Sequence, residues 1–591
     1  MPETFAEKIL GASSGSIVFR QPDLVLTHDN TASICKTFEK MGGIKVAFPD
    51  RLLVVLDHNA PPPTSKLAND YQAIRHMVRE QSIKRFHDAG EGICHELVSL
   101  HARPGMIITG SDSHTCTAGA FNALAFGIDR TEAAGLWKKG ETWFRVPESM
   151  KIVLRGKLRE GVSAKDLALW LIGTLGADGA NYLSIEFHGD GVKSLRIADR
   201  MTLANMASEM GAKNAVFPPD KVLADFYGTK ALKGIWADED ATYTRTLEVD
   251  LSEVLPVVAA PHQVDNVHAV SEFERTEIQQ ALIGTCANGR IEDLRVAANI
   301  LEGKRVKPDV QLLIIPASRK VYLQAVEEGL VSIFLKAGAN ILSASCGPCL
   351  GTGQGIPADH TTVISTANRN FIGRMGNLTA SIFLASPEVV AASALTGYIT
   401  DPTSLSKGKK FPFPPVRQNT YTILPGENRK TGNIWNYVDI DHLNTDQMFA
   451  GNLTYTILSS DADAIRPHLF KGFDENFAEK VEAGDIIIAG ENFGCGSSRE
   501  HPAVGLAHAG VKAVIVKSVN RIFYRSCINQ GLLLLVHPGL VNAYKPGDMI
   551  TIWPEKGEIL LNNTLFTLPP LPEALMEIVR NKGLVSYYKN H

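Results

Sequence analysis

The chain has 591 residues, of which 45% are hydrophobic, so it is long enough for several separately packed domains. Its 59 basic and 63 acidic residues give a formal net charge of −4, which provides no overall basic field for nucleic acid or an acidic membrane. The residues at the amino terminus lack the pattern of a signal sequence, and no aliphatic run is long enough to span a membrane. We expect a soluble, cytoplasmic protein with a small-molecule partner and reduced cysteines.

Short β-branched segments followed by polar residues recur along the first 400 residues. They are "DLVLTHDNT" from residue 23, "RLLVVLDHN" from residue 51, "GMIITGSDSHT" from residue 105, "VQLLIIPAS" from residue 310 and "HTTVISTANRNFIGR" from residue 360. This rhythm is typical of an α/β fold, in which parallel strands feed helices and ligands bind beyond the carboxyl ends of the strands. We therefore expect the polar clusters to converge on one crevice.

A composition break rich in Pro, Lys, Gly and Asn predicts a linker over residues 401–433. Beyond it, "VKAVIVKSVNRIFYRSCINQGLLLLV" reads strand, helix, strand, which predicts a smaller α/β unit over 434–591. Softer boundaries near Pro147 and Val257 divide the first part into three predicted α/β domains: 1–147, 148–256 and 257–400.

Cys346 and Cys349, in "CGPCLGTGQG", are spaced for one metal ion or cluster. Cys286, in "LIGTCANGRIEDL", follows an apolar strand and is a plausible third ligand. Structural zinc sites have four protein ligands, whereas three thiolates on a cubic iron–sulfur cluster leave one iron without a protein ligand. Spacing alone leaves an alternative, in which Cys286 is a core thiol and the Cys-x-x-Cys is a turn or half of a zinc site.

Five motifs resemble those of the aconitase superfamily, which includes aconitase, homoaconitase and 3-isopropylmalate dehydratase. In the family's order they are "SDSHT" from residue 111, "GTCAN" from 284, "SCGPCLG" from 345, "NRNFIGR" from 368 and "GCGSSREH" from 494. The resemblance implies three aconitase-type α/β domains around a [4Fe–4S] cluster, and a C-terminal swivelling α/β domain. It also implies that Cys286, Cys346 and Cys349 hold this cluster, whose fourth iron binds substrate.

"GCGSSREH" places Ser497, Ser498 and Arg499 in a Gly-rich loop that we expect to open a helix, where backbone N–H groups favour anions. Alone, the two serines also fit a helix N-cap. The resemblance implies that Ser497 is the catalytic base, and that Ser498 and Arg499 bind substrate.

Asp57 and His58 are adjacent just past a predicted strand, and Asp112 and His114 repeat the pattern. A carboxylate beside a histidine fixes the tautomer of the ring, which suits a proton donor. A single Asp-His dipeptide, however, commonly lies in a surface loop without such a role. The resemblance implies that Asp57 and His58 are the acid pair, and that Asp112 and His114 support them. It adds two catalytic positions, His95 in "GICHELV" and Glu209 in "ANMASEMGA". Without the resemblance, the sequence around Glu209 would indicate a solvent-exposed position on a helix.

Two arginines in "NRNFIGR", Arg369 and Arg374, suit bidentate binding of carboxylates, unless they are surface charges. The resemblance implies that they bind substrate or groups near the cluster, together with Asn288 and Asn368. His28 and Thr117 stand at substrate-site positions where aconitase itself has Gln and Asn. These two choices favour the 3-isopropylmalate dehydratase and homoaconitase branch, with the large and small subunits fused in one chain.

We therefore expect an iron–sulfur hydro-lyase that interconverts a 2-hydroxy di- or tricarboxylic acid with its unsaturated acid. The substrate is a substituted malate, either 3-isopropylmalate-like or homocitrate-like. The loop that commonly selects the substituent reads Asn452-Leu453-Thr454-Tyr455 here in place of a Tyr-Leu pattern, so it names no substituent. Both a monomer and a homo-oligomer are compatible with the sequence.

Three alternatives remain at this stage. One is an aconitate hydratase acting on citrate and isocitrate. Another is an iron-sensing RNA-binding protein, against which the near-neutral charge speaks. The third is an electron carrier, which would need a fourth cysteine such as Cys495.

Overall fold

The computed structural model describes residues 2–230, 232–403 and 429–590, and the side chains of Asn452 and Tyr455 are also outside the described part. Most of the predicted linker, 401–433, therefore lies outside the described residues. None of the described helices is long and apolar enough to cross a membrane.

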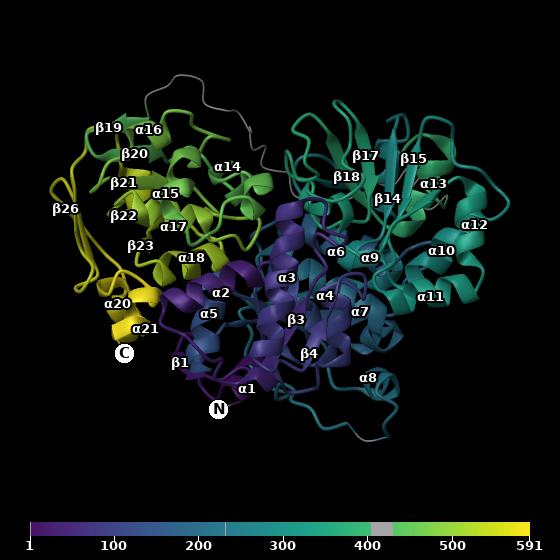
Figure 1. The fold of residues 1–591 in the computed structure, drawn as a ribbon, viewed down its shortest axis with the longest axis horizontal. Coiled ribbons are helices and arrows are strands. Elements are labelled where there is room, and N and C mark those ends of the chain that lie inside the picture. The colour runs from purple at the N-terminus through teal and green to yellow at the C-terminus, as the bar shows by residue number, and fades with distance from the viewer. Residues whose placement is uncertain (1, 231, 404–428, 591) are drawn as a thin grey trace.

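The first sheet is parallel and buried on both faces. Its strands, in spatial order, are β4 (Arg85–His87), β3 (Leu52–Val55), β2 (Leu24–Thr27), β5 (Ile107–Gly110) and β6 (Leu124–Gly127). The continuous apolar runs of β2, β3 and β6 fit such a sheet, because neither face meets water. The longer helices of this region are α2 (Thr31–Lys40), α3 (Ser65–Glu80) and α5 (Arg130–Lys139), drawn in purple and blue in Figure 1. Its two-stranded ribbon pairs β1 (Ile17–Arg20) with β7 (Thr142–Arg145).

The second sheet is also parallel and packs against two apolar helices. Its strands are β10 (Asn214–Val216), β9 (Ser184–His188), β8 (Ser149–Arg155) and β11 (Arg245–Asp250). The helices are α6 (Ala164–Leu175) and α7 (Ile197–Met206), whose residues belong to the largest buried core. α6 is buried on almost every side, which explains its nearly continuous apolar sequence.

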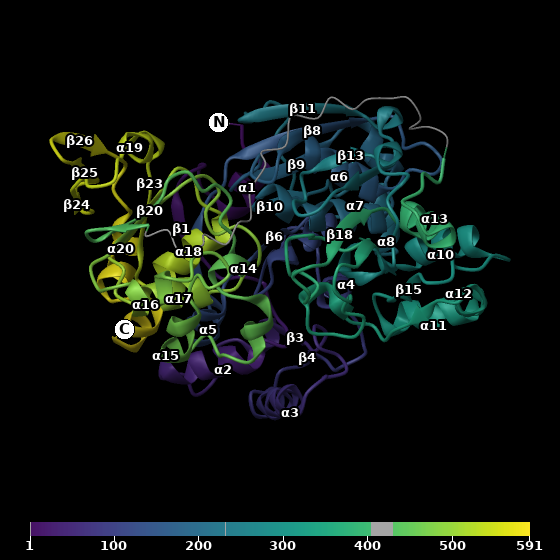
Figure 2. The ribbon, with the colours of Figure 1, turned by 90° about the horizontal axis from the view of Figure 1, so that it is seen from above.

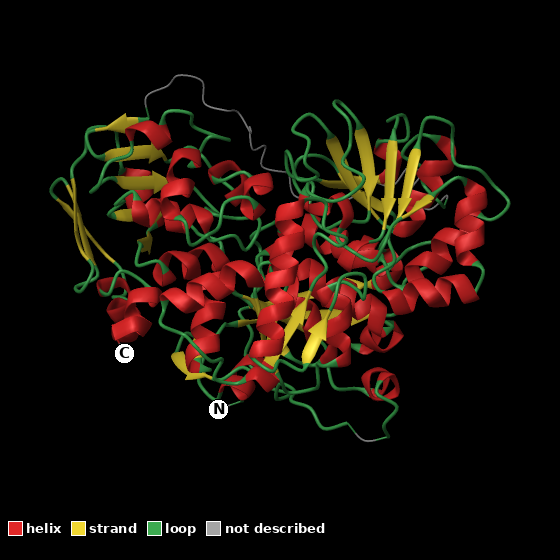
Figure 3. Cartoon of the chain, viewed as in Figure 1, coloured by secondary structure: helices red, strands yellow, loops and turns green. Residues whose placement is uncertain are grey.

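The third sheet has seven strands: β13 (Val267–Ala269), β12 (Val257–Ala259), β18 (Ser381–Ala385), β17 (Thr362–Ser365), β14 (Gln280–Ile283), β15 (Gln311–Ile314) and β16 (Asn340–Ile341). β14 to β18 are parallel, and β12 is antiparallel to both of its neighbours. Its helices are α10 (Ile291–Leu301), α11 (Arg319–Glu327), α12 (Leu330–Ala337) and α13 (Pro387–Thr396). In Figure 3 the strands of this sheet are a fan of yellow arrows, separate from the strands of the first sheet.

The C-terminal unit lies to one side of the others in both Figure 1 and Figure 2. Its main sheet orders β19 (Lys430–Thr431), β20 (Ile434–Tyr437), β21 (Ile486–Ala489), β22 (Ala513–Val516) and β23 (Leu533–Val536). A second sheet is an antiparallel meander of β24 (Ile550–Trp553), β25 (Glu558–Leu561) and β26 (Thr564–Thr567). The longer helices are α17 (His501–His508), α18 (Arg521–Asn529), α20 (Glu573–Arg580) and α21 (Leu584–Asn590).

The α/β class that the sequence predicts is confirmed. All five quoted segments form parallel strands, namely β2, β3, β5, β15 and β17. The predicted strand, helix and strand of the C-terminal unit are β22, α18 and β23. The domain boundaries after residues 147, 256 and 400 stay a prediction.

Candidate active site

One cavity collects side chains from the carboxyl ends of strands in three of the sheets. β2, β3 and β5 lead to His28, His58 and Asp112, and β14, β16 and β17 lead to Cys286, Cys346 and Asn368. The loop after β21 in the C-terminal unit adds Ser497, Ser498 and Arg499. The predicted crevice thus collects the polar residues of four of the five quoted segments, whereas those that follow β15 do not line it.

Three cysteines form one wall of this cavity. Cys286 lies in α9 (Thr285–Asn288), and Cys349 in the 3₁₀ turn η8 (Gly347–Leu350), which Cys346 caps. Gly347 has a φ of 54°, and a Cβ there would come within 2.3 Å of Ile315 Cδ1. Glycine suits this turn because its φ is positive, and any other residue would also have to displace the end of the Ile315 side chain.

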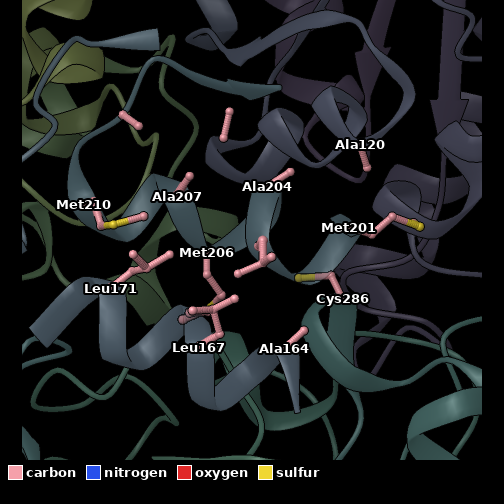
Figure 4. Packing of buried hydrophobic residues seen from close by; sticks show 14 of the residues in the cluster. Ala120, Ala164, Leu167, Leu171, Met201, Ala204, Met206, Ala207, Met210 and Cys286 are labelled. Atoms are coloured by element: carbon pink, nitrogen blue, oxygen red, sulfur yellow. The ribbon is translucent and has the colours of Figure 1, made fainter. Parts of the chain in front are cut away.

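The three cysteines are 6–8% exposed, and the thiols of Cys286 and Cys349 each meet a polar donor. Figure 4 shows Cys286 beside buried side chains of α6 and α7, and burial raises its pKa to about 12. Asn205 Nδ2 donates to Cys286 Sγ at 3.5 Å, and Arg374 Nη2 donates to Cys349 Sγ at 3.8 Å. Because such donors favour the thiolate form, and metal binding requires thiolates, these residues fit a thiolate-bound cluster.

A fourth cysteine is absent from the described residues that line this cavity. Cys495 lines a neighbouring cavity instead, where its Sγ donates to the carbonyl oxygen of His442 at 3.3 Å. The complete four-cysteine shell expected of an electron carrier is therefore not formed by Cys495.

Asp57 and His58 form a buried hydrogen-bonded pair, and a backbone N–H fixes the carboxylate of Asp57. His58 Nδ1 lies 2.6 Å from Asp57 Oδ1, and the backbone N–H of Cys94 donates to Asp57 Oδ2 at 2.7 Å. Burial would raise the pKa of Asp57, but the charge and hydrogen bond of His58 hold it below its usual value. Because Asp57 is ionised, Nδ1 carries a proton and Nε2 points to the other side of the ring.

Asp112 joins three histidines. Its Oδ1 lies 2.8 Å from His95 Nε2 and accepts from the backbone N–H of His114 at 2.7 Å, and its Oδ2 lies 3.3 Å from His58 Nε2. Burial would raise the pKa of Asp112, but His95 and the hydrogen bonds from His114 and His58 hold it well below its usual range. His28 stacks on His58 with 3.9 Å between ring centroids.

Glu209 lies behind the cavity and holds two of its lining residues. Its carboxylate is 2.8 Å from His114 Nε2 and accepts from Arg369 Nε at 2.9 Å. Burial opposes ionisation, but Arg369 and His114 lower the pKa of Glu209 to about 2. The predicted catalytic role of Glu209 stays a prediction, and the contacts seen are those to His114 and Arg369.

Ser497 is bound by Arg499, whose Nε donates to Ser497 Oγ at 2.7 Å. Arg499 is itself fixed by the carbonyl of Phe449 at 2.8 Å and by Asp446 at 2.9 Å. The structure differs from the sequence expectation in one respect, because α17 begins only at His501, with Pro502 in its first turn. The serines therefore precede the helix, and the guanidinium next to Ser497 provides the positive charge instead.

Two predicted substrate-binding residues lie away from the cavity. Thr117 is fully buried between His114 and Asn205, with its hydroxyl donating to the carbonyl of His114 at 2.7 Å. Asn288 Nδ2 donates to Asp293 at 2.9 Å. Neither residue is among those that line the cavity with Asn368, Arg369 and Arg374.

The sequence reasoning missed several lining residues: Asn30, Ser111, Ser113, Arg130, Leu350 and Gly451. Thr454, which the sequence places in the loop that commonly selects the substituent, also lines the cavity. Arg130 follows β6 by three residues, so the rule that found His28 and Asp57 could have found it as well.

The comparisons with known proteins agree with this geometry. Residues 4–397 match the model of the aconitase family (aconitate hydratase), and residues 431–539 match that of the aconitase C-terminal domain. The chain is 46% identical over 413 residues to 3-isopropylmalate dehydratase large subunit 2 of Archaeoglobus fulgidus, a match that covers 68% of this chain and 99% of that protein. It is also 46% identical over 389 residues to the probable methanogen homoaconitase large subunit of Methanosarcina mazei. This match covers 65% of this chain and 99% of that protein. The chain therefore belongs to the aconitase family of hydro-lyases and carries the family's C-terminal domain in the same polypeptide.

Proposed function

We propose that this enzyme reversibly dehydrates a 2-hydroxy di- or tricarboxylic acid, a substituted malate, to its unsaturated acid in the cytoplasm. The observation that carries the proposal is that Ser497 and His58 face the same cavity as three thiols and four arginines. A base, an acid and carboxylate-binding cations are the groups that such an elimination needs.

We further propose that Cys286, Cys346 and Cys349 hold a [4Fe–4S] cluster. When bound, the cluster would supply a Lewis acid that polarises the departing hydroxyl group. The polar donors around the sulfurs, and the lack of a fourth cysteine among the described lining residues, support this assignment.

Ser497 removes the proton from the carbon next to a carboxylate. Arg499 donates to Ser497 Oγ at 2.7 Å, so the hydroxyl hydrogen must point elsewhere, and the adjacent positive charge stabilises the alkoxide. Asp446 and the carbonyl of Phe449 prevent the guanidinium from turning away.

His58 gives a proton to the leaving hydroxyl. Asp57 stabilises the protonated ring at Nδ1, and Asp112 lies 3.3 Å from Nε2 on the opposite side. The carbon–oxygen bond breaks to release water, and the electrons of the broken carbon–hydrogen bond form the double bond. Rehydration runs through the same groups in reverse.

The substrate carboxylates have three candidate partners in Arg369, Arg374 and Ser498, which all line the cavity. Arginine suits this task because its fixed fork of donors matches a carboxylate. Glu209 orients Arg369 without touching the cavity, which keeps that guanidinium in place between turnovers.

We also propose that residues 434–591 act as a swivelling domain on the linker 401–433, and that the domains 1–147, 148–256 and 257–400 surround the cluster. Ser497 and Arg499 come from the C-terminal unit, whereas the thiols and His58 come from the others. Opening would admit substrate, and closure would exclude water from the proton transfers.

The test is anaerobic reconstitution with iron and sulfide, followed by a scan of substituted malates and citrate-like acids for the ultraviolet absorbance of a conjugated enoate. We expect turnover of one acid, and its loss in Cys346→Ala. A chain that assembles its cluster but dehydrates none of these acids would contradict the proposal.

A further inference from the structure

A second cavity lies where the C-terminal unit meets the rest of the chain, and among the described residues it shares no lining with the candidate active site. β1, β7 and the loop around Asn181 line one side, whereas β23, β24, β25 and α20 line the other. Its volume is about 520 Å³. Sites for small molecules span roughly 300–1,000 Å³ and often lie between domains, so this second cavity is large enough for an organic ligand.

Apolar side chains make up most of the wall of the second cavity. Ile17, Leu534 and Ile552 are aliphatic examples, and Trp143 and Trp553 add indole rings. An apolar ligand gains affinity from each part of its surface that leaves water for such a wall. The lining therefore suits a molecule with an aliphatic or aromatic body.

Arg145 places a positive charge at the edge of this apolar wall. It is the exposed last residue of β7, and its guanidinium lies over the ring of Tyr182, 5.3 Å from the ring centroid. Within the part of the chain that the structure describes, its side chain forms no ion pair or hydrogen bond. Contact with an aromatic ring leaves the N–H groups of a guanidinium able to bind an anion, so Arg145 can take a carboxylate.

The other polar groups of the wall also favour an anion. Its charged residues are Arg145, Arg521 and Glu558, which leaves an excess of positive charge. Trp143 and Arg521 are 1% and 2% exposed, and neither Trp143 Nε1 nor Arg521 Nη1 has a hydrogen-bond partner among the described residues. Buried donors without partners are uncommon in proteins, and an acceptor on a ligand would serve them.

We propose that the second cavity binds a small amphipathic carboxylate. The carboxylate pairs with Arg145, and the apolar body lies between Trp143 and the aliphatic side chains of the C-terminal unit. The site is separate from the one that performs the proposed reaction, and the inference does not depend on that reaction. Because the ligand touches both sides of the cavity, it strengthens the contact between the C-terminal unit and the rest of the chain.

The first experiment titrates the reconstituted full-length protein with three probes. These are 3-phenylpropanoate, its uncharged amide 3-phenylpropanamide, and acetate, which has the carboxylate without the body. We expect 3-phenylpropanoate to bind with a Kd of a few millimolar or lower. The amide should bind about 3- to 10-fold more weakly, because it lacks the charge that pairs with the exposed Arg145, and acetate should show no saturable binding.

Two variants with matched controls test the named residues. Arg145→Gln should remove the preference for the carboxylate over the amide, whereas Arg305→Gln, at an exposed arginine of a loop, should keep it. Val536→Trp should abolish binding of both ring-containing probes, because Val536 is 40% exposed, lines the cavity and can carry a larger side chain into it. Leu323→Trp, at a 57% exposed position on α11, should bind as the wild type does. An unchanged preference in Arg145→Gln, or unchanged binding in Val536→Trp, would overturn the inference.

Amide hydrogen exchange shows where the probe lies. Saturation with 3-phenylpropanoate should slow exchange in β7 and β23, on opposite sides of the second cavity, and leave η8 of the candidate active site unchanged. This readout needs no turnover, so the proposed function can fail while the second site stands. Slower exchange in η8 alone would place the probe in the active site and refute the second site, as would a lack of saturable binding to the wild type.

Discussion

Asp29 shows how a single residue outside the cavity arranges the proposed acid. Its carboxylate accepts hydrogen bonds from the backbone N–H groups of Asp57, His58 and Asn59 at 2.9, 3.2 and 2.7 Å, and from the hydroxyl of Tyr71 at 2.8 Å. This fixes the turn after β3, so that Asp57 meets His58 Nδ1 and the opposite edge of the ring faces Asp112. The orientation of the acid is therefore set before substrate binds.

Asp57→Asn should lower kcat roughly 10³-fold, because the amide no longer stabilises a protonated imidazole and selects the wrong tautomer. The measurement is kcat at matched iron content per chain. Asp225→Asn, at an exposed carboxylate paired with Lys221, is the control and should keep full activity. A kcat of Asp57→Asn within about threefold of the wild type would remove His58 from the role of acid.

Most of the residues that line the cavity could be predicted, because they occur in contiguous motifs directly after strands. The exceptions have physical reasons. Thr117 and Asn288 belong to motifs of this kind, yet 3₁₀ and α-helical turns direct them into the interior and toward Asp293. Thr454 lies in the 3₁₀ turn η9 (Gly451–Tyr455) and lines the cavity, and the resemblance had already placed it in the loop that commonly selects the substituent.

At the scale of elements, the backbone conformation of the 3₁₀ turn η8 determines where two of the three cavity cysteines lie. Gly347 adopts a left-handed conformation, and a Cβ there would overlap the end of the Ile315 side chain. The turn places Cys346 and Cys349 on one wall of the cavity. The backbone conformation at Gly347 therefore sets the relative positions of the two thiols.

Gly347→Ala should reduce the iron bound per chain after reconstitution, because the added Cβ is strained at this φ and collides with Ile315. Gly303→Ala is a matched control, since Gly303 has a φ of 69° but open space around its Cβ position. If both variants bind as much iron as the wild type, the turn does not determine cluster assembly.

The start of α17 marks the limit of prediction at this scale. The motif "GCGSSREH" suggested a helix that opens at the serines, whereas Glu500 is the N-cap and the helix begins at His501. A proline in the first turn fits a helix that starts there, and the preceding Gly-rich segment stays a loop. Strand and helix types were predictable from local pattern, but the first residue of this helix was not predicted, although Pro502 marks it.

Over the whole molecule, a buried polar interface joins the C-terminal unit to α5. Arg525 and Glu132 form an ion pair with side chains 1% exposed, Asn529 Nδ2 donates to Asp129 at 2.8 Å, and Glu500 accepts from the N–H of Thr131 at 3.0 Å. These contacts link regions nearly 400 positions apart in the chain, so no local sequence pattern could predict them. They position the loop of Ser497 over the cavity.

This interface should weaken as pH rises. Burial beside Glu500 and Glu132 raises the pKa of Asp129 to about 8, although the backbone N–H of Glu132 and Asn529 Nδ2 donate to its carboxylate. A raised folded-state pKa means that stability is full at low pH, falls above the ordinary pKa, and is lost as pH passes the folded value.

Asp129→Asn should therefore show a smaller fall in the midpoint of thermal unfolding between about pH 6 and about pH 9 than the wild type shows. The expected difference is a few degrees, and Asp225→Asn should keep the wild-type fall. Equal pH dependence in Asp129→Asn and the wild type would show that Asp129 does not titrate in this range.

The most direct test of the account is hydration of the unsaturated acid in deuterium oxide by reconstituted wild type, Ser497→Ala and the exposed-serine control Ser332→Ala. The account predicts that the wild type and the control each place one solvent deuteron on the carbon next to a carboxylate. In Ser497→Ala, at unchanged iron content, the rate of that step should fall at least about 10³-fold. Deuterium incorporation at the wild-type rate in Ser497→Ala would contradict the account, because the proton would then be carried by another group.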